Sequence, residues 1–159
     1  MGPPLRFLPF LVLVAVGCRG GHVTSPTTPP TAAAIFIAID PDPVVATESD
    51  NPDAPLDARW TVEITSPAIG ARVNFVNAIL RDGASGAEAQ PSGTLSLGPA
   101  EIAAVAGSNR VEPHGRLTVP GSLQYGLPSG GRQGVLTVTV QLTDDGGSLT
   151  SKSARVAVN

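Results

Sequence analysis

Cys18 carries the most reactive side chain of the molecule and is the only cysteine in its 159 residues. A thiolate is a strong nucleophile that can form a thioether with an activated carbon. Because the chain has no second cysteine, no internal disulfide can form, and the fold must be stable without one. The residues around Cys18 therefore decide what chemistry this thiol serves.

The segment before Cys18 has the features of a secretory signal peptide. Arg6 provides a basic start, and an unbroken apolar run follows from Phe7 to Val16. A membrane-spanning helix needs about 20 apolar residues, so this run is too short to span and fits the apolar region of a signal. Small residues, Ala15 and Gly17, then precede Cys18 in a pattern typical of a cleavage site.

The stretch Ala15-Val16-Gly17-Cys18 resembles the lipobox of bacterial lipoproteins, usually read as Leu-[Ala/Ser]-[Gly/Ala]-Cys. Gly17 and Cys18 match well, whereas Ala15 replaces the commoner leucine. The resemblance implies that Cys18 becomes the first mature residue, with a diacylglyceryl group on its sulfur and a palmitate-like chain on its amino group. Two or more acyl chains anchor a protein stably, at about 0.8 kcal/mol per buried CH₂. A plain secreted protein and an uncleaved anchor are the alternatives.

Composition divides the chain into a signal peptide at 1–17, a lipidated cysteine with a Gly/Pro/Thr tether at 18–31, and a domain at 32–159. The implied location is the bacterial cell envelope, with a lipid anchor in the outer membrane. A net charge of −3 offers no basic field for nucleic acid. We expect a monomer that contacts the membrane through its anchor, with a protein or glycan of the envelope as the partner.

The domain shows the pattern of short antiparallel strands. Apolar and polar residues alternate over 59–65 and again over 135–143, which places one face of each strand in a core. Asp144-Asp145-Gly146-Gly147 predicts a hairpin turn between 135–143 and 148–158. The sequence predicts about seven strands, with no clear amphipathic helix. It further predicts a bulge near Val76-Asn77, a kinked strand or two short strands over 117–125, a helical turn or strand over 102–106, and a loop over 107–115.

This pattern resembles the immunoglobulin-like and fibronectin type III-like modules of bacterial surface proteins. The resemblance covers 33–159 and implies an all-β, antiparallel, immunoglobulin-like β-sandwich with a structural or binding role. One alternative is a carbohydrate or surface-adhesion module, which requires Trp60 or Tyr125 exposed on a flat sheet face. The alternation around Trp60 favours a core position instead.

An enzyme is the other alternative, and the sequence gives it little support. Nucleophilic catalysis needs a nucleophile, a base and an orienting acid. His22 lies in the tether, so His114, between Pro113 and Gly115, is the only histidine of the domain. Neither a G-x-S-x-G elbow nor a phosphate-binding loop nor a Cys/His metal spacing is present. We expect no enzymatic activity and no cofactor, unless His114 lies in a polar cleft beside an acid and a hydroxyl.

Acidic residues gather over 40–57, after a first predicted strand within 32–39 and around a brief strand suggested over 44–47, and no basic residue occurs there. Four of them, Asp40, Asp42, Asp50 and Asp53, could converge on Ca²⁺, which takes six to eight oxygen ligands. Their spacing matches no EF-hand loop, and solvated turns also favour Asp and Pro. We therefore expect these four residues to lie in solvated turns and to bind no metal. A calcium site formed by them is the alternative.

Calcium should leave the unfolding midpoint of the protein unchanged relative to chelator. A site that binds only the native state would add about 2.7 kcal/mol at a hundredfold excess over its dissociation constant, which an unfolding curve resolves easily. Magnesium at matched ionic strength is the control for screening of the carboxylates. A rise in midpoint that is specific to calcium and lost in Asp42→Asn would contradict the expectation.

Overall fold

The computed structural model describes residues 34–66 and 68–159. Cys18, the predicted signal at 1–17 and the tether at 18–31 lie outside the described residues. The strands are β1 (Phe36–Asp40), β2 (Ala46–Glu48), β3 (Leu56–Thr65), β4 (Ala71–Asp82), β5 (Thr94–Leu97), β6 (Arg110–Val111), β7 (Arg116–Tyr125), β8 (Gly134–Asp144) and β9 (Leu149–Val158). One helix, α1 (Pro99–Ala106), joins β5 to β6. The described chain is thus all-β apart from this short helix.

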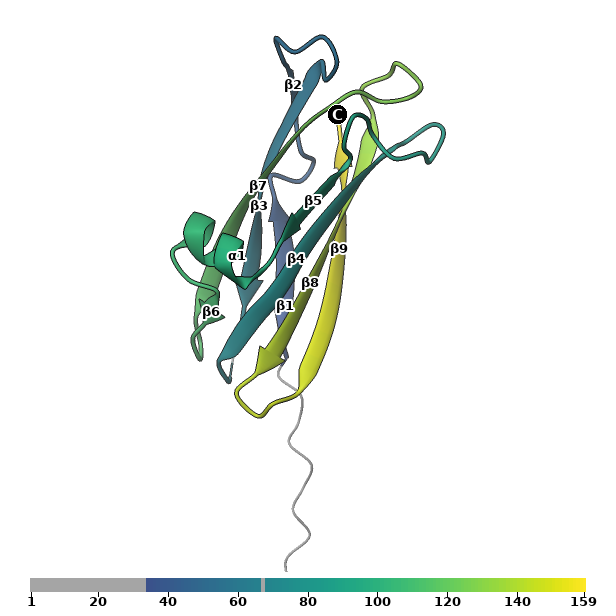
Figure 1. The fold of residues 1–159 in the computed structure, drawn as a ribbon. Helices are drawn as coiled ribbons and strands as arrows, with labels where there is room; N and C mark the ends of the chain where they lie inside the picture. The colour runs from purple at the N-terminus through teal and green to yellow at the C-terminus, as the bar shows by residue number, and fades with distance from the viewer. Residues whose placement is uncertain (1–33, 67) are drawn as a thin grey trace, which may run out of the picture.

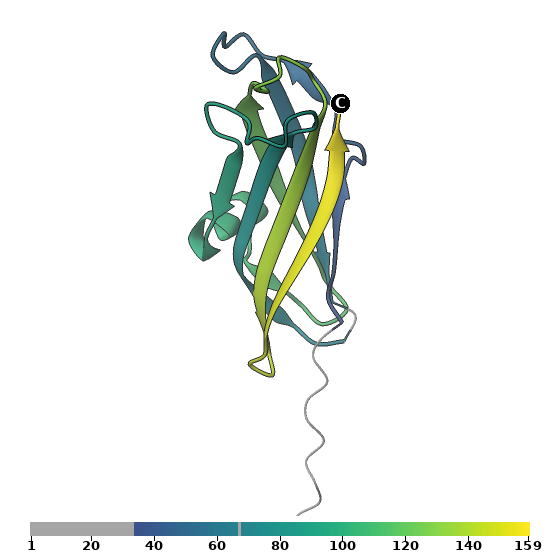
Figure 2. The same ribbon diagram turned by 90° about the vertical axis from the view of Figure 1, so that its right-hand side faces the viewer.

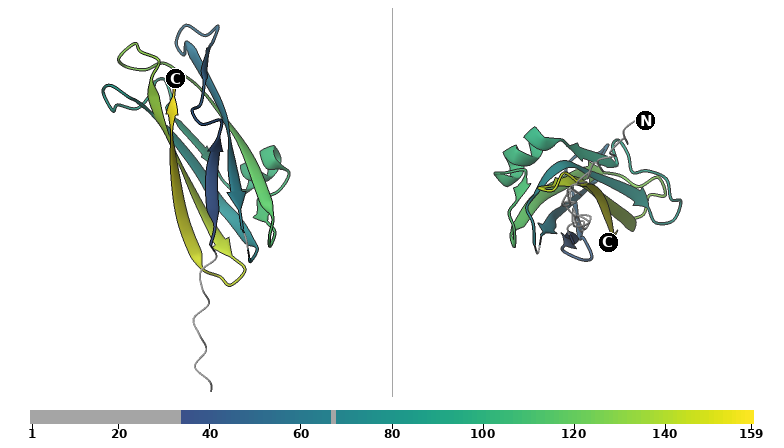
Figure 3. Two further views of the ribbon diagram at one scale, coloured as in Figure 1. Left: turned by 180° about the vertical axis from the view of Figure 1, so that it is seen from behind. Right: turned by 90° about the horizontal axis from the view of Figure 1, so that it is seen from below.

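The strands form two antiparallel sheets that face each other (Figures 1 and 3). In sheet A, β3 pairs with β7 along one edge and with β1 and β2 along the other. In sheet B, β4 pairs with β5 and β6 along one edge and with β8 along the other, and β9 lies outside β8. Among the described residues there are nine strands, so the prediction of about seven is wrong. The two short strands account for the difference: β2, of 3 residues, overlaps the brief strand that the sequence suggests over 44–47, and β6, of 2 residues, is too short to show an alternating pattern.

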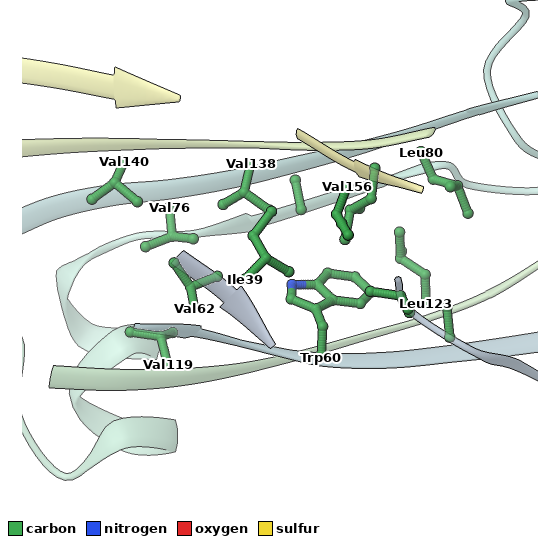
Figure 4. Packing of buried hydrophobic residues seen from close by; sticks show 14 of the residues in the cluster. Ile39, Trp60, Val62, Val76, Leu80, Val119, Leu123, Val138, Val140 and Val156 are labelled. Carbon is green, nitrogen blue, oxygen red and sulfur yellow. The ribbon is translucent and has the colours of Figure 1, made fainter. Parts of the chain in front are cut away.

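The space between the sheets is filled by aliphatic side chains around one tryptophan (Figure 4). The predicted alternation is confirmed in β3, where Trp60, Val62 and Ile64 are buried, and in β8, where Leu136 to Leu142 are buried at every second position. The same strands place polar or charged residues on the outer faces, as half-buried antiparallel sheets require.

Trp60 and Gly121 occupy opposite positions on the paired strands β3 and β7. The indole lies across Gly121, and a Cβ added at this glycine would come within 2.6 Å of Cε2 and 2.7 Å of Nε1 of Trp60. Any larger residue would therefore collide with the ring. Although Pro120 precedes Gly121, β7 is one continuous strand. Proline has no N–H to donate, and it is tolerated here because β7 is an edge strand whose outer side pairs with no other strand of sheet A.

Val44 joins the two sheets on the side opposite the helix. Its amide donates to the carbonyl of Ala157 at 2.9 Å, and its carbonyl accepts from the amide of Asn159 at 3.0 Å. Two residues later, Ala46 pairs with Ala58 of sheet A and donates to the carbonyl of Asn159 at 2.8 Å. The segment between β1 and β2 therefore closes the sandwich at this edge.

Asp82 joins two loops at the end of the sandwich where β4 finishes. One carboxylate oxygen accepts from the amides of Ala84 at 2.8 Å and Ser85 at 3.4 Å, and the other accepts from the amide of Ser129 at 2.7 Å. The side chain is buried. A single acid thus holds the loop after β4 against the loop between β7 and β8.

Two local predictions differ from the structure, and a third left two alternatives open. The irregularity in β4 lies between Val73 and Phe75 and not near Val76-Asn77. Residues 99–106 form a helix, started by Pro99 in the first turn and ended by Gly107 with a φ of 77°. The predicted loop over 107–115 contains β6, whose Arg110 binds Asp145 with two nitrogens at 2.9 and 2.8 Å. The helix agrees with the helical-turn alternative predicted over 102–106 and has local start and stop signals, whereas the irregularity in β4 and the strand β6 depend on contacts with distant residues, which the local pattern does not contain.

Trp60→Ala should lower the free energy of unfolding by about 3–5 kcal/mol, because it removes the largest core side chain and leaves a cavity above Gly121. Chemical denaturation followed by circular dichroism measures the change. Phe36→Ala is the control, since Phe36 is 62% exposed and should cost less than about 1 kcal/mol. Equal losses in the two variants would show that Trp60 is not a core residue.

Candidate functional site

A groove of about 610 Å³ lies on the side of the sandwich where α1 is found. On this side β5 is an edge strand of sheet B and β7 is an edge strand of sheet A. Leu95 and Leu97 of β5 and Val105 of α1 form one wall of the groove, and Pro120 and Gly121 of β7 form the other. This volume lies within the range of about 300–1,000 Å³ that is typical of ligand sites.

Trp60 reaches the groove because Gly121 has no side chain. The indole extends across Gly121 toward the edge of β7, and Trp60 lines the groove although only 3% of the residue is exposed. The edge of the indole ring therefore forms part of the floor of the groove, and aliphatic side chains form its walls. Such a surface binds apolar groups without a covalent step.

The polar residues of the groove lie on the outer face of sheet A. Asp40, Arg59, Thr61 and Ser122 contribute side chains or backbone at its rim. Arg59 is held in place by Asp57, which accepts from its Nε at 3.0 Å and from Nη2 at 2.8 Å. A mostly apolar groove with a few charged groups at its rim is typical of a binding site that orients a ligand.

His114 does not lie in the polar cleft that the enzyme alternative requires. It has a φ of 58° and lines a small hollow of about 280 Å³ with Ser66, Arg116 and three other residues, none of them acidic. Ser66 is buried and donates its hydroxyl to the carbonyl of Ile69. The hollow therefore offers His114 a hydroxyl that is already engaged and no carboxylate.

The four calcium candidates follow β1 and β2. Asp40 ends β1, Asp42 lies in the turn after it, and Asp50 and Asp53 lie in the loop between β2 and β3. In this loop the amide of Asp53 donates to the side chain of Asn51 at 3.1 Å, as in a polar turn. Within residues 34–66 and 68–159, no three His, Cys, Asp or Glu side chains lie close enough to hold a metal ion. The calcium test remains a prediction.

Neither aromatic candidate for carbohydrate binding lies exposed on a sheet face. Trp60 is 3% exposed and Tyr125 is fully buried. The hydroxyl of Tyr125 has no hydrogen-bond partner among the described residues, and burial raises its pKa. An adhesion module built on these two rings therefore has no exposed platform in this structure.

Two further charged pairs stand near the ends of the sandwich. Arg132 binds Glu48 at 3.1 Å beside a second hollow of about 450 Å³. At the other end, hydrogen bonds from Arg110 lower the pKa of Asp145, and the nearby charge of Arg72 lowers it further. Both pairs are largely exposed, so we assign them to positioning of loops.

Sequence reasoning missed the groove because its walls come from β5, α1 and β7, which meet only in the folded chain. One signal was present: Pro120-Gly121 interrupts an otherwise alternating strand. A glycine inside a strand often marks the close approach of another group. Here that group is the indole of Trp60.

An apolar dye such as anilinonaphthalene sulfonate should bind the groove and take up excitation energy from Trp60, the only tryptophan. Val105→Glu should weaken this transfer severalfold, because it places a charge on the groove wall. Val45→Glu is the matched control, since Val45 is 61% exposed and Val105 47%, and Val45 does not line the groove. Equal effects of the two variants would mean that the dye binds elsewhere.

Comparison with known proteins supports the architecture alone. No protein-family model matches the chain, and no curated protein matches its sequence. Among solved structures, the chain is similar to a Bordetella pertussis protein assigned as ApaA, with a TM-score of 0.57 and 16% identity over 79% of this chain and 92% of that chain. It is also similar to a structural-genomics target, SoR45, with a TM-score of 0.51 and 14% identity over 78% of this chain and 86% of that chain. At these identities the likeness is one of fold.

Proposed function

We propose that this chain is a lipid-anchored envelope lipoprotein that displays a single immunoglobulin-like domain as a binding module. The anchor rests on Ala15-Val16-Gly17-Cys18 and on the apolar run before it. The residues described by the structure contain no helix that is long and apolar enough to cross a bilayer. In this proposal Cys18 provides the membrane attachment in the outer membrane, and the domain acts as a monomer without a cofactor.

The order of the strands supports the immunoglobulin-like assignment. Without the short strands β2 and β6, sheet A consists of β1, β3 and β7, and sheet B consists of β5, β4, β8 and β9 in that order. The first, second and fifth strands of an immunoglobulin-like sandwich share one sheet in the same way, facing the third, sixth and seventh; the fourth strand, β5 here, differs from the constant-type immunoglobulin arrangement because it lies in the sheet of the third strand. Fibronectin type III domains have this architecture without sequence similarity.

The observation that carries the binding role is the groove over Trp60. Its walls are aliphatic, and its charged groups lie only at the rim. The small enzyme is the weaker alternative because His114 lacks a neighbouring acid. A carbohydrate module on exposed aromatic rings is weaker as well, because both rings are buried.

The fold also suits presentation from a tether. β1 begins at one end of the sandwich, whereas Asn159 and the loops after β2, β4 and β7 lie at the other end (Figures 1 and 3). A tether that enters at β1 would hold these loops away from the membrane. The groove lies on the side of the domain, so a ligand could reach it without contacting lipid.

Cys18→Ser should move the protein from the membrane fraction to the soluble fraction, because the proposed anchor depends on lipid on this one sulfur. Intact-mass measurement of the wild-type protein should give a chain that begins at Cys18 and carries acyl groups. Ser25→Cys with Cys18→Ser is the control for the position of the thiol, and it should stay soluble. A mature chain that begins elsewhere, or one without acyl mass, would end the lipoprotein proposal.

A further inference from the structure

The outer face of sheet B is formed by the outward side chains of β4, β8 and β9, which lie side by side in a twisted sheet (Figure 2). The helix α1 packs against β7, β4 and β5 at the edge of the sandwich remote from β9, and it leaves β8 and β9 uncovered. The groove over Trp60 is lined by other elements, so the two surfaces are separate.

Charge is distributed unevenly between the two sheets. None of the outward positions of β4, β8 and β9 carries an acid, since Asp82 and Asp144 point inward and are buried. Among the described residues, every arginine outside these strands forms an ion pair with an acid, as Arg59 does with Asp57 and Arg116 with Glu63. The arginines of the sheet B outer face form none.

Three arginines make this face cationic: Arg72 and Arg81 on β4, and Arg155 on β9. Arg72 lies near Asp145, so its charge is partly balanced. Arg81 is opposite Glu88 in the backbone, but the carboxylate of Glu88 accepts from the hydroxyl of Thr94 at 2.7 Å. Arg81 donates Nη1 to the carbonyl of Gly86 at 3.2 Å, so its remaining guanidinium donors, together with those of Arg155, are the ones available to a carboxylate or sulfate.

Arg81 and Arg155 flank β8 at neighbouring positions. Arg81 pairs with Val135, and Arg155 pairs with Thr137, two residues further along β8. From the usual spacing of strands and residues, their Cα atoms are about 12 Å apart. Two guanidinium groups on strands either side of β8 can therefore contact two separate anionic groups of one extended polymer.

Uncharged hydrogen-bonding groups cover the face between the arginines. One row crosses the whole sheet: Asn77 donates to Ser96 at 2.9 Å, and Thr139 shares a hydrogen bond with Ser153 at 2.9 Å. Asn77 and Thr139 are opposite each other on β4 and β8, so this row is continuous. It offers donors and acceptors to a chain of hydroxyl groups lying across the strands.

Phe75 gives the same face an apolar surface. It stands opposite Gln141 of β8, two residues along β8 from Thr139, and is 37% exposed. An aromatic ring beside amide and hydroxyl groups suits a sugar ring, which has one apolar face and a polar periphery.

We propose that the sheet B outer face binds an acidic polysaccharide, with Arg81 and Arg155 on its anionic groups and the Asn77–Thr139 row on its hydroxyls. This surface is additional to the groove of the proposed binding module. The proposed ligand is defined by its negative charge, its hydroxyl groups and its extended shape. Trp60 and Tyr125 take no part in binding it, because both are buried.

Affinity electrophoresis and calorimetry of the full-length chain in non-ionic detergent test this proposal with three glycans: polygalacturonate, dextran sulfate and uncharged dextran. We expect binding to at least one acidic glycan, weakening with salt, and none to dextran. Arg81→Gln with Arg155→Gln should reduce affinity at least tenfold. Arg116→Gln with Arg132→Gln changes the net charge equally, at two ion-paired arginines away from both this face and the groove, and should stay within twofold of wild type.

Thr139→Val tests the polar row independently of charge. This substitution keeps the shape of the side chain but removes its hydroxyl group. Glycan affinity should therefore fall two- to fivefold, while the salt dependence of binding stays unchanged because no charge is altered. Val105→Glu, on the groove wall, should leave glycan binding intact, and this separates the proposal from the role of the groove. Thermal unfolding checks that each variant is folded.

Several outcomes would overturn the proposal. These are failure to bind both acidic glycans, equal losses in the two double arginine variants, or equal binding of single-stranded DNA, which would indicate a general attraction to polyanions. Sedimentation as a dimer that the Arg81→Gln and Arg155→Gln variant disrupts, without glycan binding, would assign the face to a second copy of the chain instead.

Discussion

The contact between the indole of Trp60 and the backbone of Gly121 constrains most of this molecule. The ring occupies the space that a Cβ at position 121 would need, so β7 can pair with β3 only if it carries glycine there. The same contact places the largest aromatic ring of the core at the edge of sheet A. The core and the groove therefore share one residue, and a change in the packing of Trp60 alters both.

Much of the fold follows from local sequence. Alternation in β3 and β8, and the Asp144-Asp145-Gly146-Gly147 turn, predicted paired strands with one buried face, and the structure confirms them. The predicted position of the irregularity in β4 was wrong. The apolar pattern shows that the buried face changes from one set of alternate residues to the other, but it does not show where. Only the register with β8 places the change between Val73 and Phe75. Short ladders such as β6 arise from tertiary contacts and leave no periodic signal.

Candidate sites were harder to predict than strands. Sequence reasoning correctly placed Trp60 in the core, but it could not show that a glycine on another strand brings the ring to a groove. The arrangement of charge was also hidden. Arg59 and Arg155 look alike in the sequence, and only pairing shows that one is bound to Asp57 while the other stands on a face without acids. Features that follow from local alternation could thus be predicted from the sequence, whereas contacts between residues far apart in the chain could not.

Asp82 determines how the loop end of the domain responds to protons. Hydrogen bonds from the side chain of Ser129, and then from the amides of Ala84, Ser129 and Ser85, hold the pKa of this carboxyl well below its usual range, against the opposing effect of burial. A carboxyl with a lowered folded pKa stabilises the fold above its unfolded pKa, about 3.9, and this contribution is lost as the pH falls toward the folded value. The link between the two loops therefore stabilises the fold fully above the unfolded pKa and progressively less as the pH falls below it.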